Sequence, residues 1–157
     1  MSLSAPPTPR PRPRSFLAFD FGTRRIGVAA GNSLLRTAQA LTTVQAHGDA
    51  RFDAIARLLK EWQPDALVIG VPFHPDGVAH DNTRRARAFG RQLYGRFKLP
   101  VHEVDERYST TEALAAGARD GDADAAAAAI ILEQYLRALP DPDDPDDTEA
   151  TDTDAAA

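Results

Sequence analysis

The sequence predicts an α/β protein built on a mixed five-stranded sheet that is flanked by helices. Two apolar runs, 16–19 and 66–71, are typical of strands covered on both faces of a sheet. A short turn after the first run leads directly into a second strand, which indicates an antiparallel hairpin. Helical and extended patterns alternate after residue 49, which favours parallel strands in the rest of the sheet. We therefore expect three antiparallel strands followed by parallel ones.

The expected elements follow one another through the central part of the chain. Strands are predicted at 16–20, 26–30, 38–44, 66–72 and 101–104. Helices are predicted at 49–62, at 82–97, from Ser109 onward and at 124–139. The helix from Ser109 is indicated by a capping box, in which Glu112 follows the N-cap serine by three residues.

Length and composition restrict the class of protein. The 157 residues suggest one domain with a proper core. The chain contains no cysteine, which excludes a disulfide framework and a thiolate metal site. No apolar run is long enough for a membrane span or typical of a secretory signal. We therefore expect a cytoplasmic protein without a membrane partner.

Charge is distributed unevenly between the ends and the centre of the chain. Of 18 basic and 23 acidic residues, three basic residues lie in 1–14 and eight acidic residues lie in 141–157. Residues 15–139 therefore hold 15 of each and have no net charge. The proline-rich arm 1–14 and the acidic tail 140–157 are predicted to be disordered, and 15–139 to be the folded domain. The acidic balance of the whole chain does not exclude a nucleic-acid partner.

Three carboxylates are expected to meet at one edge of the sheet. Asp20 ends the first strand, and Glu106 follows the fifth. Asp124 shares a helix face with Ile131 and Tyr135, so its side chain should point toward the sheet. Sites in such sheets lie beyond the carboxyl ends of the parallel strands. Three carboxylates at that edge repel each other unless a hard cation such as Mg²⁺ or Mn²⁺ neutralises them.

Each carboxylate also has a purely structural interpretation. Asp20 could belong to a turn beside Gly22. Glu106 could pair with Arg107 or with the N-terminus of the next helix. Asp124 could interact with the helix dipole, with Asp122 as the N-cap. The three residues together favour a functional interpretation.

Four motifs resemble the YqgF (RuvX) family, the resolvase-like relatives of ribonuclease H. The opening motif is Phe19-Asp20-Phe21-Gly22-Thr23-Arg24-Arg25-Ile26-Gly27-Val28-Ala29. The second is Ile69-Gly70-Val71-Pro72 with Asp76-Gly77, and the third is Asp105-Glu106-Arg107-Tyr108-Ser109-Thr110. The last is Asp124 followed by Ala127-Ala128 and Ile131-Leu132-Glu133-Gln134-Tyr135-Leu136. The matches are in order and span nearly all of 15–139.

The resemblance implies a ribonuclease H-like fold for 15–139 and a metal-dependent nuclease activity. Bacterial members are described as nucleases that mature the 5′ end of 16S ribosomal RNA, and an older label is Holliday junction resolvase. Carried over by motif, the catalytic and metal-binding carboxylates are Asp20, Glu106 and Asp124. The segment 112–123 is shorter than is usual in the family, which leaves Asp122 as a rival for the third position.

Substrate binding is expected to be electrostatic. The helix at 82–97 carries several arginines without an acid among them, and Arg84, Arg87 and Arg91 share one of its faces. Arg24, Arg25 and Arg107 lie next to the predicted catalytic groups in the sequence. The expected partner is a nucleic acid, either precursor ribosomal RNA or branched DNA, bound by a monomer or a weak homodimer.

Two other classes of protein remain open from the residues alone. Asp20-Phe21-Gly22-Thr23 after a strand also resembles the phosphate site of actin-like ATPases and sugar kinases, but those need a second comparable domain. A binding module that retains its carboxylates without catalysis is the non-enzymatic alternative. Retained nucleic-acid binding with unaltered cleavage in an Asp20→Asn variant would favour the binding module.

Overall fold

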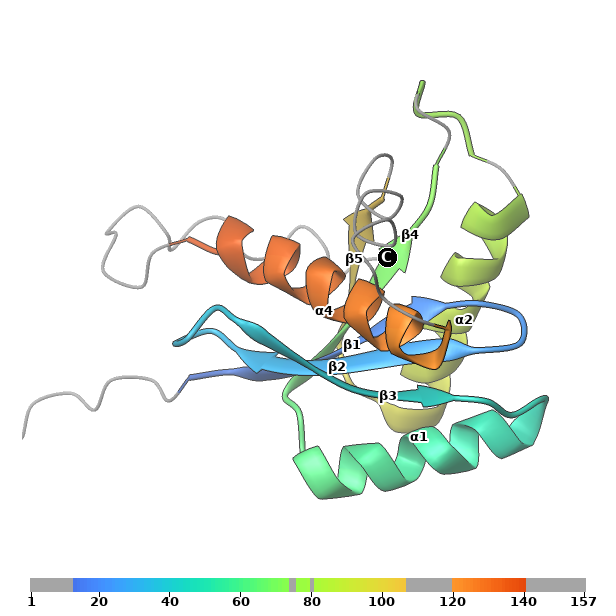
Figure 1. Cartoon of the computed structure of the whole chain (residues 1–157), viewed down its shortest axis with the longest axis horizontal. Coiled ribbons are helices and arrows are strands. Elements are labelled where there is room, and N and C mark those ends of the chain that lie inside the picture. Colours follow the sequence, from blue (N-terminus) through green and yellow to red (C-terminus); the bar gives the residue numbers. More distant parts are fainter. Residues whose placement is uncertain (1–12, 74–75, 80, 107–119, 141–157) are drawn as a thin grey trace, which may run out of the picture.

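Figure 1 shows the computed structural model of the chain, which describes residues 13–73, 76–79, 81–106 and 120–140. The side chains of residues 120–122 are not part of this description. The helix predicted from Ser109 lies outside the described residues. So do most of the predicted arm and nearly all of the predicted tail, at 1–12 and 141–157.

Five strands form one mixed sheet in the order β3-β2-β1-β4-β5. The strands are β1 (Ser15–Phe21), β2 (Ile26–Asn32), β3 (Ala38–Val44), β4 (Ala66–Val71) and β5 (Val101–Asp105). The pairs β1–β2 and β2–β3 are antiparallel, and the pairs β1–β4 and β4–β5 are parallel. The predicted fold class, with three antiparallel strands followed by parallel ones, is confirmed.

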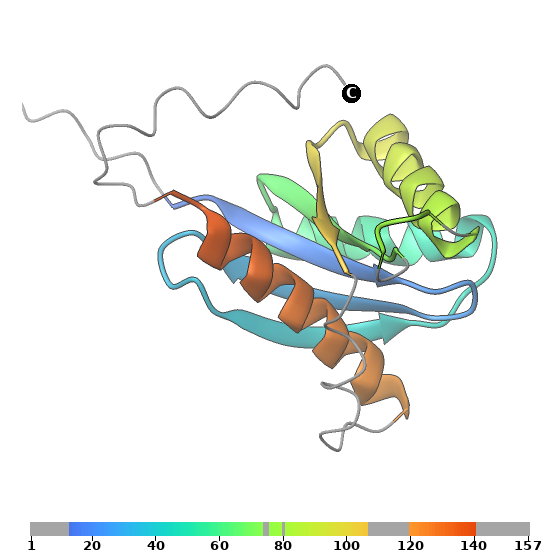
Figure 2. The ribbon, with the colours of Figure 1, turned by 90° about the horizontal axis from the view of Figure 1, so that it is seen from above.

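Helices cover both faces of this sheet. The helices are α1 (Asp49–Trp62), α2 (Asp81–Phe97) and α4 (Asp120–Ala138). Figure 2 shows α4 on one side of the sheet and α1 with α2 on the other. None of the helices in the described ranges is long and apolar enough to cross a membrane.

The central strand β1 is apolar along its length because it is covered on both faces. Its odd-numbered residues Leu17 and Phe19 pack in the core beneath α1 and α2. Its even-numbered residues Phe16 and Ala18 pack in the core beneath α4. Successive side chains of a strand alternate between faces, so Asp20 continues the α4 face.

Two helices begin earlier than the sequence predicts. The last helix starts at Asp120 rather than Asp124, so Asp124 lies more than one turn inside it. Asp124 is therefore too far from the helix end for the dipole interpretation, whose effect falls off within the first turn. The second helix starts at Asp81 rather than Asn82, so this basic helix does carry an acid in its first turn.

Candidate active site

Asp20 lies near the end of β1, level with two glycines in the neighbouring strands. It pairs with Gly27 of β2. On the other side, Gly70 of β4 follows Ile69, the partner of Phe19. The side chain of Asp20 is thus flanked by strand positions without side chains, which leaves space around the carboxylate on the α4 face.

Glu106 approaches the same place from β5. It directly follows Asp105, and its N–H donates to the carbonyl oxygen of Val71 at 3.0 Å, which extends the pairing of β4 and β5 by one residue. The side chain is 8 % exposed. A Cβ atom placed on Gly70 would lie 3.1 Å from the Cγ atom of Glu106, so the glycine leaves the room that this side chain occupies.

Asp124 reaches the site from α4, on the helix face that packs against the sheet. Ala127, Ala128 and Ile131 on this face are buried, as the helical spacing predicts. Gly27 permits the close approach, because a Cβ atom there would lie 1.8 Å from the carbonyl oxygen of Asp124. The side chain of Asp124 is 22 % exposed.

The far end of α4 is fixed to the β2–β3 connection. The guanidinium of Arg36 donates to the carbonyl oxygens of Leu139 and Pro140 at 2.8 and 2.7 Å. Glu133 accepts a hydrogen bond from the backbone N–H of Ala38 at 3.1 Å. These contacts and the packing on Gly27 determine where α4 presents Asp124.

Gly27 and Gly70 each support the site, a role that their place in the sequence motifs alone does not define. A glycine inside an apolar strand often indicates that another part of the chain approaches closely, and this was the available signal. At Gly70, an added Cβ would lie 2.5 Å from Cδ1 of Ile131. Gly27 and Gly70 therefore shape the space between the sheet and α4.

Glu106 and Asp124 lie close enough to Asp20 to perturb its ionisation. Burial, followed by the negative charges of Glu106 and Asp124, raises the pKa of Asp20 from 3.8 to about 7. The structure therefore brings together the three acidic residues predicted to form the site. The side chain of the rival Asp122 lies outside the described residues.

The oxygen atoms of these three carboxylates are of the chemical type that binds a divalent cation. The Oδ2 atom of Asp124 is buried and has no hydrogen-bond partner within the described part of the chain. Carboxylate oxygens are the ligands that Mg²⁺ and Mn²⁺ prefer in proteins. Nevertheless, no three acidic or histidine side chains among the described residues converge closely enough to hold an ion. The carboxylates would have to turn toward a common point to bind one.

The raised pKa of Asp20 predicts how the stability of the metal-free protein depends on pH. The folded protein keeps a proton on Asp20 up to about pH 7, whereas the unfolded chain releases it near 3.8. The unfolding free energy should therefore fall as the pH rises between these values, by at most about 1.4 kcal/mol per pH unit from this group. Thermal melts in EDTA between pH 5 and pH 8 measure the trend.

The Asp20→Asn variant isolates this contribution from those of the other acidic groups. It has no carboxylate to titrate at this position, so its melting temperature should fall less than that of the wild-type chain over the same pH range. Parallel pH profiles for the two proteins would contradict the raised pKa of Asp20.

The arginines predicted to bind substrate have different environments. Arg25 lies at the site, with its Nε atom 3.1 Å from Oδ2 of Asp124. Arg24 is exposed on the same turn. Arg107 lies outside the described residues.

The basic helix α2 is less positive than its own sequence suggests. Arg84 pairs with Asp81 at 2.9 Å and Arg87 with Glu103 at 3.3 Å. Arg91 is exposed, and no acidic side chain in the described ranges lies within ion-pair distance of it. Moreover, α2 packs on the sheet face opposite Asp20. A nucleic acid that touches both α2 and the carboxylates must therefore pass around an edge of the sheet.

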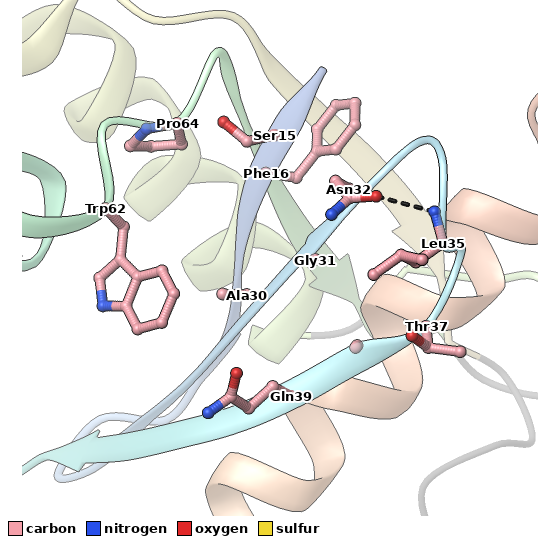
Figure 3. Close-up of a pocket in the computed structure, with 11 residues that line it drawn as sticks. Ser15, Phe16, Ala30, Gly31, Asn32, Leu35, Thr37, Gln39, Trp62 and Pro64 are labelled. Atoms are coloured by element: carbon pink, nitrogen blue, oxygen red, sulfur yellow. Dashed lines mark hydrogen bonds between the residues drawn. The ribbon is translucent and has the colours of Figure 1, made fainter. Parts of the chain in front are cut away.

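A pocket of about 260 Å³ lies at the other end of β1 (Figure 3). It is lined by Ser15, Phe16, Ala30, Gly31, Asn32, Leu35, Thr37, Ala38, Gln39, Trp62 and Pro64. None of these side chains is charged, and Ser15 lies five residues before Asp20, about 17 Å along the strand. Asn32 accepts hydrogen bonds from the backbone N–H groups of Leu34 and Leu35. This pocket is separate from the carboxylates.

The mixed sheet in the order β3-β2-β1-β4-β5, with helices on both faces, is a ribonuclease H-like fold. The fold agrees with that of RuvC from T. thermophilus, whose structure was solved in complex with a Holliday junction substrate. The likeness has a TM-score of 0.51 at 19% sequence identity, and covers 80% of this chain and 94% of RuvC.

A family model described as "RuvX: Holliday junction resolvase" matches residues 14–138, and the chain belongs to this family. Similar proteins carry the name "Putative pre-16S rRNA nuclease". One from Albidiferax ferrireducens is 71% identical over 80% of both chains. One from Polaromonas sp. is 64% identical over 89% of this chain and 100% of the relative. One from Burkholderia pseudomallei is 56% identical over 83% of this chain and 92% of the relative. The family predicted from the motifs is confirmed.

Proposed function

We propose that this chain is a metal-dependent endonuclease that acts on precursor 16S ribosomal RNA during maturation of its 5′ end. The observation that carries the proposal is the cluster of Asp20, Glu106 and Asp124, in which burial, and then the two neighbouring charges, raise the pKa of Asp20. A cluster that is costly to ionise without a counter-charge is typical of a catalytic or metal site. The names of relatives at 56% to 71% identity support the choice of substrate.

In this proposal the three carboxylates hold one or two ions of Mg²⁺ or Mn²⁺. When bound there, such a cation would lower the pKa of a water and would stabilise negative charge during phosphodiester hydrolysis. Glu106 is buried, and its backbone extends the pairing of β4 and β5 by one residue. The position of Asp124 depends on how α4 packs against the sheet. Asp20 must lose its proton before it can act as a ligand.

The arginines beside the cluster are proposed to bind the phosphates of the RNA. Arg24 and Arg25 belong to the turn that follows Asp20, so they are the nearest described basic residues in the sequence. Exposed guanidinium groups bind phosphate by hydrogen bonds and charge, which makes the affinity salt-dependent. Arg91 is a candidate for a more distant contact, since it is exposed and has no ion-pair partner in the described ranges.

Cleavage of a branched DNA is the second candidate function, favoured by the description of the family model and by the fold shared with RuvC. A resolvase makes two symmetric cuts, which require two active sites and hence a dimer. This candidate thus predicts a homodimer as the active species.

One assay distinguishes the two substrates. The full chain is incubated with a precursor 16S RNA fragment and with a four-way DNA junction, each in Mg²⁺, in Mn²⁺ and in EDTA. We expect shortening of the RNA at its 5′ side, dependent on the divalent ion, and an intact junction. Cleavage of the junction alone by a dimeric species would favour the second candidate. Cleavage of neither substrate would contradict a nuclease function.

A further inference from the structure

The backbone of Arg25 is fixed by a tight turn, whereas its side chain is about half exposed. It closes the short turn between β1 and β2, directly before Ile26, the partner of Phe21. Gly22 makes this turn tight, because a Cβ atom there would lie 2.6 Å from the carbonyl oxygen of Arg25. The side chain of Arg25 remains 46 % exposed. The turn therefore places the residue, while its guanidinium can change partner.

The guanidinium of Arg25 pairs with Oδ2 of Asp124, the buried oxygen that accepts no hydrogen bond in the described part of the chain. Arg25 Nε lies 3.1 Å from Asp124 Oδ2. The geometry is not that of a hydrogen bond, and no hydrogen-bond donor in the described part of the chain serves this buried oxygen. An ion pair with a half-exposed arginine and no hydrogen bond is weak.

Oδ2 of Asp124 is also the oxygen that we expect to bind a divalent cation, because it is buried and accepts no hydrogen bond in the described part of the chain. A guanidinium at ion-pair distance from Oδ2 of Asp124 disfavours a divalent cation at the same oxygen, because the two positive charges repel each other at that separation. In the structure in which Arg25 contacts Asp124, no three acidic or histidine side chains of the described residues are grouped closely enough to hold a metal ion.

We propose that Arg25 is the counter-ion of Asp124 in the metal-free protein, and that a divalent cation displaces it when the site is loaded. The inference rests on the proposed metal-dependent function. Arg25 is a positioning residue in this role, since it acts through Asp124. It reduces the repulsion among the carboxylates before loading, and it competes with the cation for Asp124.

The test is the affinity of the full chain for Mn²⁺, measured by isothermal titration calorimetry without substrate. Arg25→Gln removes the competing group, and Arg24→Gln removes the same charge from the adjacent exposed residue. We expect Arg25→Gln to bind Mn²⁺ about two- to fivefold more tightly than Arg24→Gln, which is the range that an exposed ion pair accounts for. Arg25→Lys, which keeps the charge, should bind more weakly than Arg25→Gln.

The possible failures can be told apart. Equal or weaker binding by Arg25→Gln relative to Arg24→Gln would overturn the role of Arg25, with the metal site left intact. Absence of Mn²⁺ binding by the wild-type chain would instead overturn the metal-dependent function. Thermal melts in EDTA verify that each variant is folded before its affinity is compared.

Discussion

We expect the Asp20→Asn protein to cleave precursor 16S RNA more than about 100-fold more slowly than the wild-type chain. Loss of an outer-shell partner of a metal ligand costs about 10- to 100-fold in affinity or activity, and Asp20 is proposed to be a ligand itself. Asparagine keeps the size of the side chain but removes the negative charge that would attract a cation. Single-turnover cleavage in saturating Mg²⁺ measures the loss.

The same substitution should not weaken the fold. Asp20 is largely buried next to two other acids, and its ionised form is costly there. Above pH 7, Asp20→Asn should therefore melt at a higher temperature than the wild-type protein in EDTA. A loss of cleavage together with a gain in stability is typical of a residue kept for function rather than for folding.

A matched control separates this effect from a general change in charge. Asp53 is an exposed residue of α1 on the opposite side of the sheet, and Asp53→Asn changes the net charge by the same amount. We expect this variant to cleave at the wild-type rate. Cleavage by Asp20→Asn within a few-fold of wild type would contradict a catalytic role for the carboxylate cluster.

Most of the fold could be predicted because its signals are local. The apolar runs of β1 and β4 are bounded by turns, and the hydrophobic spacing of α1 and α2 is regular. The sequence predicts the start of α4 four residues too late, since Asp120-Gly121-Asp122 is typical of a loop. In the structure this segment begins the helix despite its poor intrinsic propensity.

The acidic residues of the site were predictable for a similar reason. Asp20 and Glu106 follow strands, and strand ends of a parallel sheet meet at one edge. The spacing of Asp124 from buried Ile131 placed it on the inner face of α4, which the burial of that face confirms. In each case, sequence position and periodicity determine where the side chain points.

Contacts between distant residues could not be predicted in this way. Glu103 reaches Arg87 across 16 residues, and Asp49 reaches Arg96 across 47. The acids that offset the charge of α2 therefore lie mostly outside the helix itself. The raised pKa of Asp20 follows from its burial and then from the charges of Glu106 and Asp124, which no local pattern places beside it. Likewise, the pairing of Arg25 with Asp124 depends on the distance between α4 and β2.

That distance is determined by Gly27, and replacing this residue by alanine should have the largest effect on the fold. An alanine Cβ would lie 1.8 Å from the carbonyl oxygen of Asp124 and 2.9 Å from the backbone nitrogen of Ala125. The obstructing atoms are backbone, so a side-chain rotation cannot relieve the clash. Either α4 must move away from β2 or the strand must distort.

We expect Gly27→Ala to lose at least about 1–3 kcal/mol of unfolding free energy, as over-packed cores do. Its cleavage activity should fall further than this destabilisation explains, since the displaced helix carries Asp124 away from Asp20 and Glu106. Urea unfolding measures the first effect. Cleavage at a temperature where the variant is folded by circular dichroism measures the second.

Gly95→Ala provides the control for an added methyl group. Gly95 lies in α2, and an added Cβ there has no neighbour within 4 Å in the described structure. Alanine is favoured over glycine in a helix by about 1 kcal/mol, so this variant should be as stable as the wild-type chain or more so. Because Gly27 pairs with Asp20 and also contacts the backbone of Asp124, it couples the packing of α4 to the spacing of the carboxylates. A Gly27→Ala protein with wild-type stability and wild-type cleavage would show that the site does not depend on this close approach.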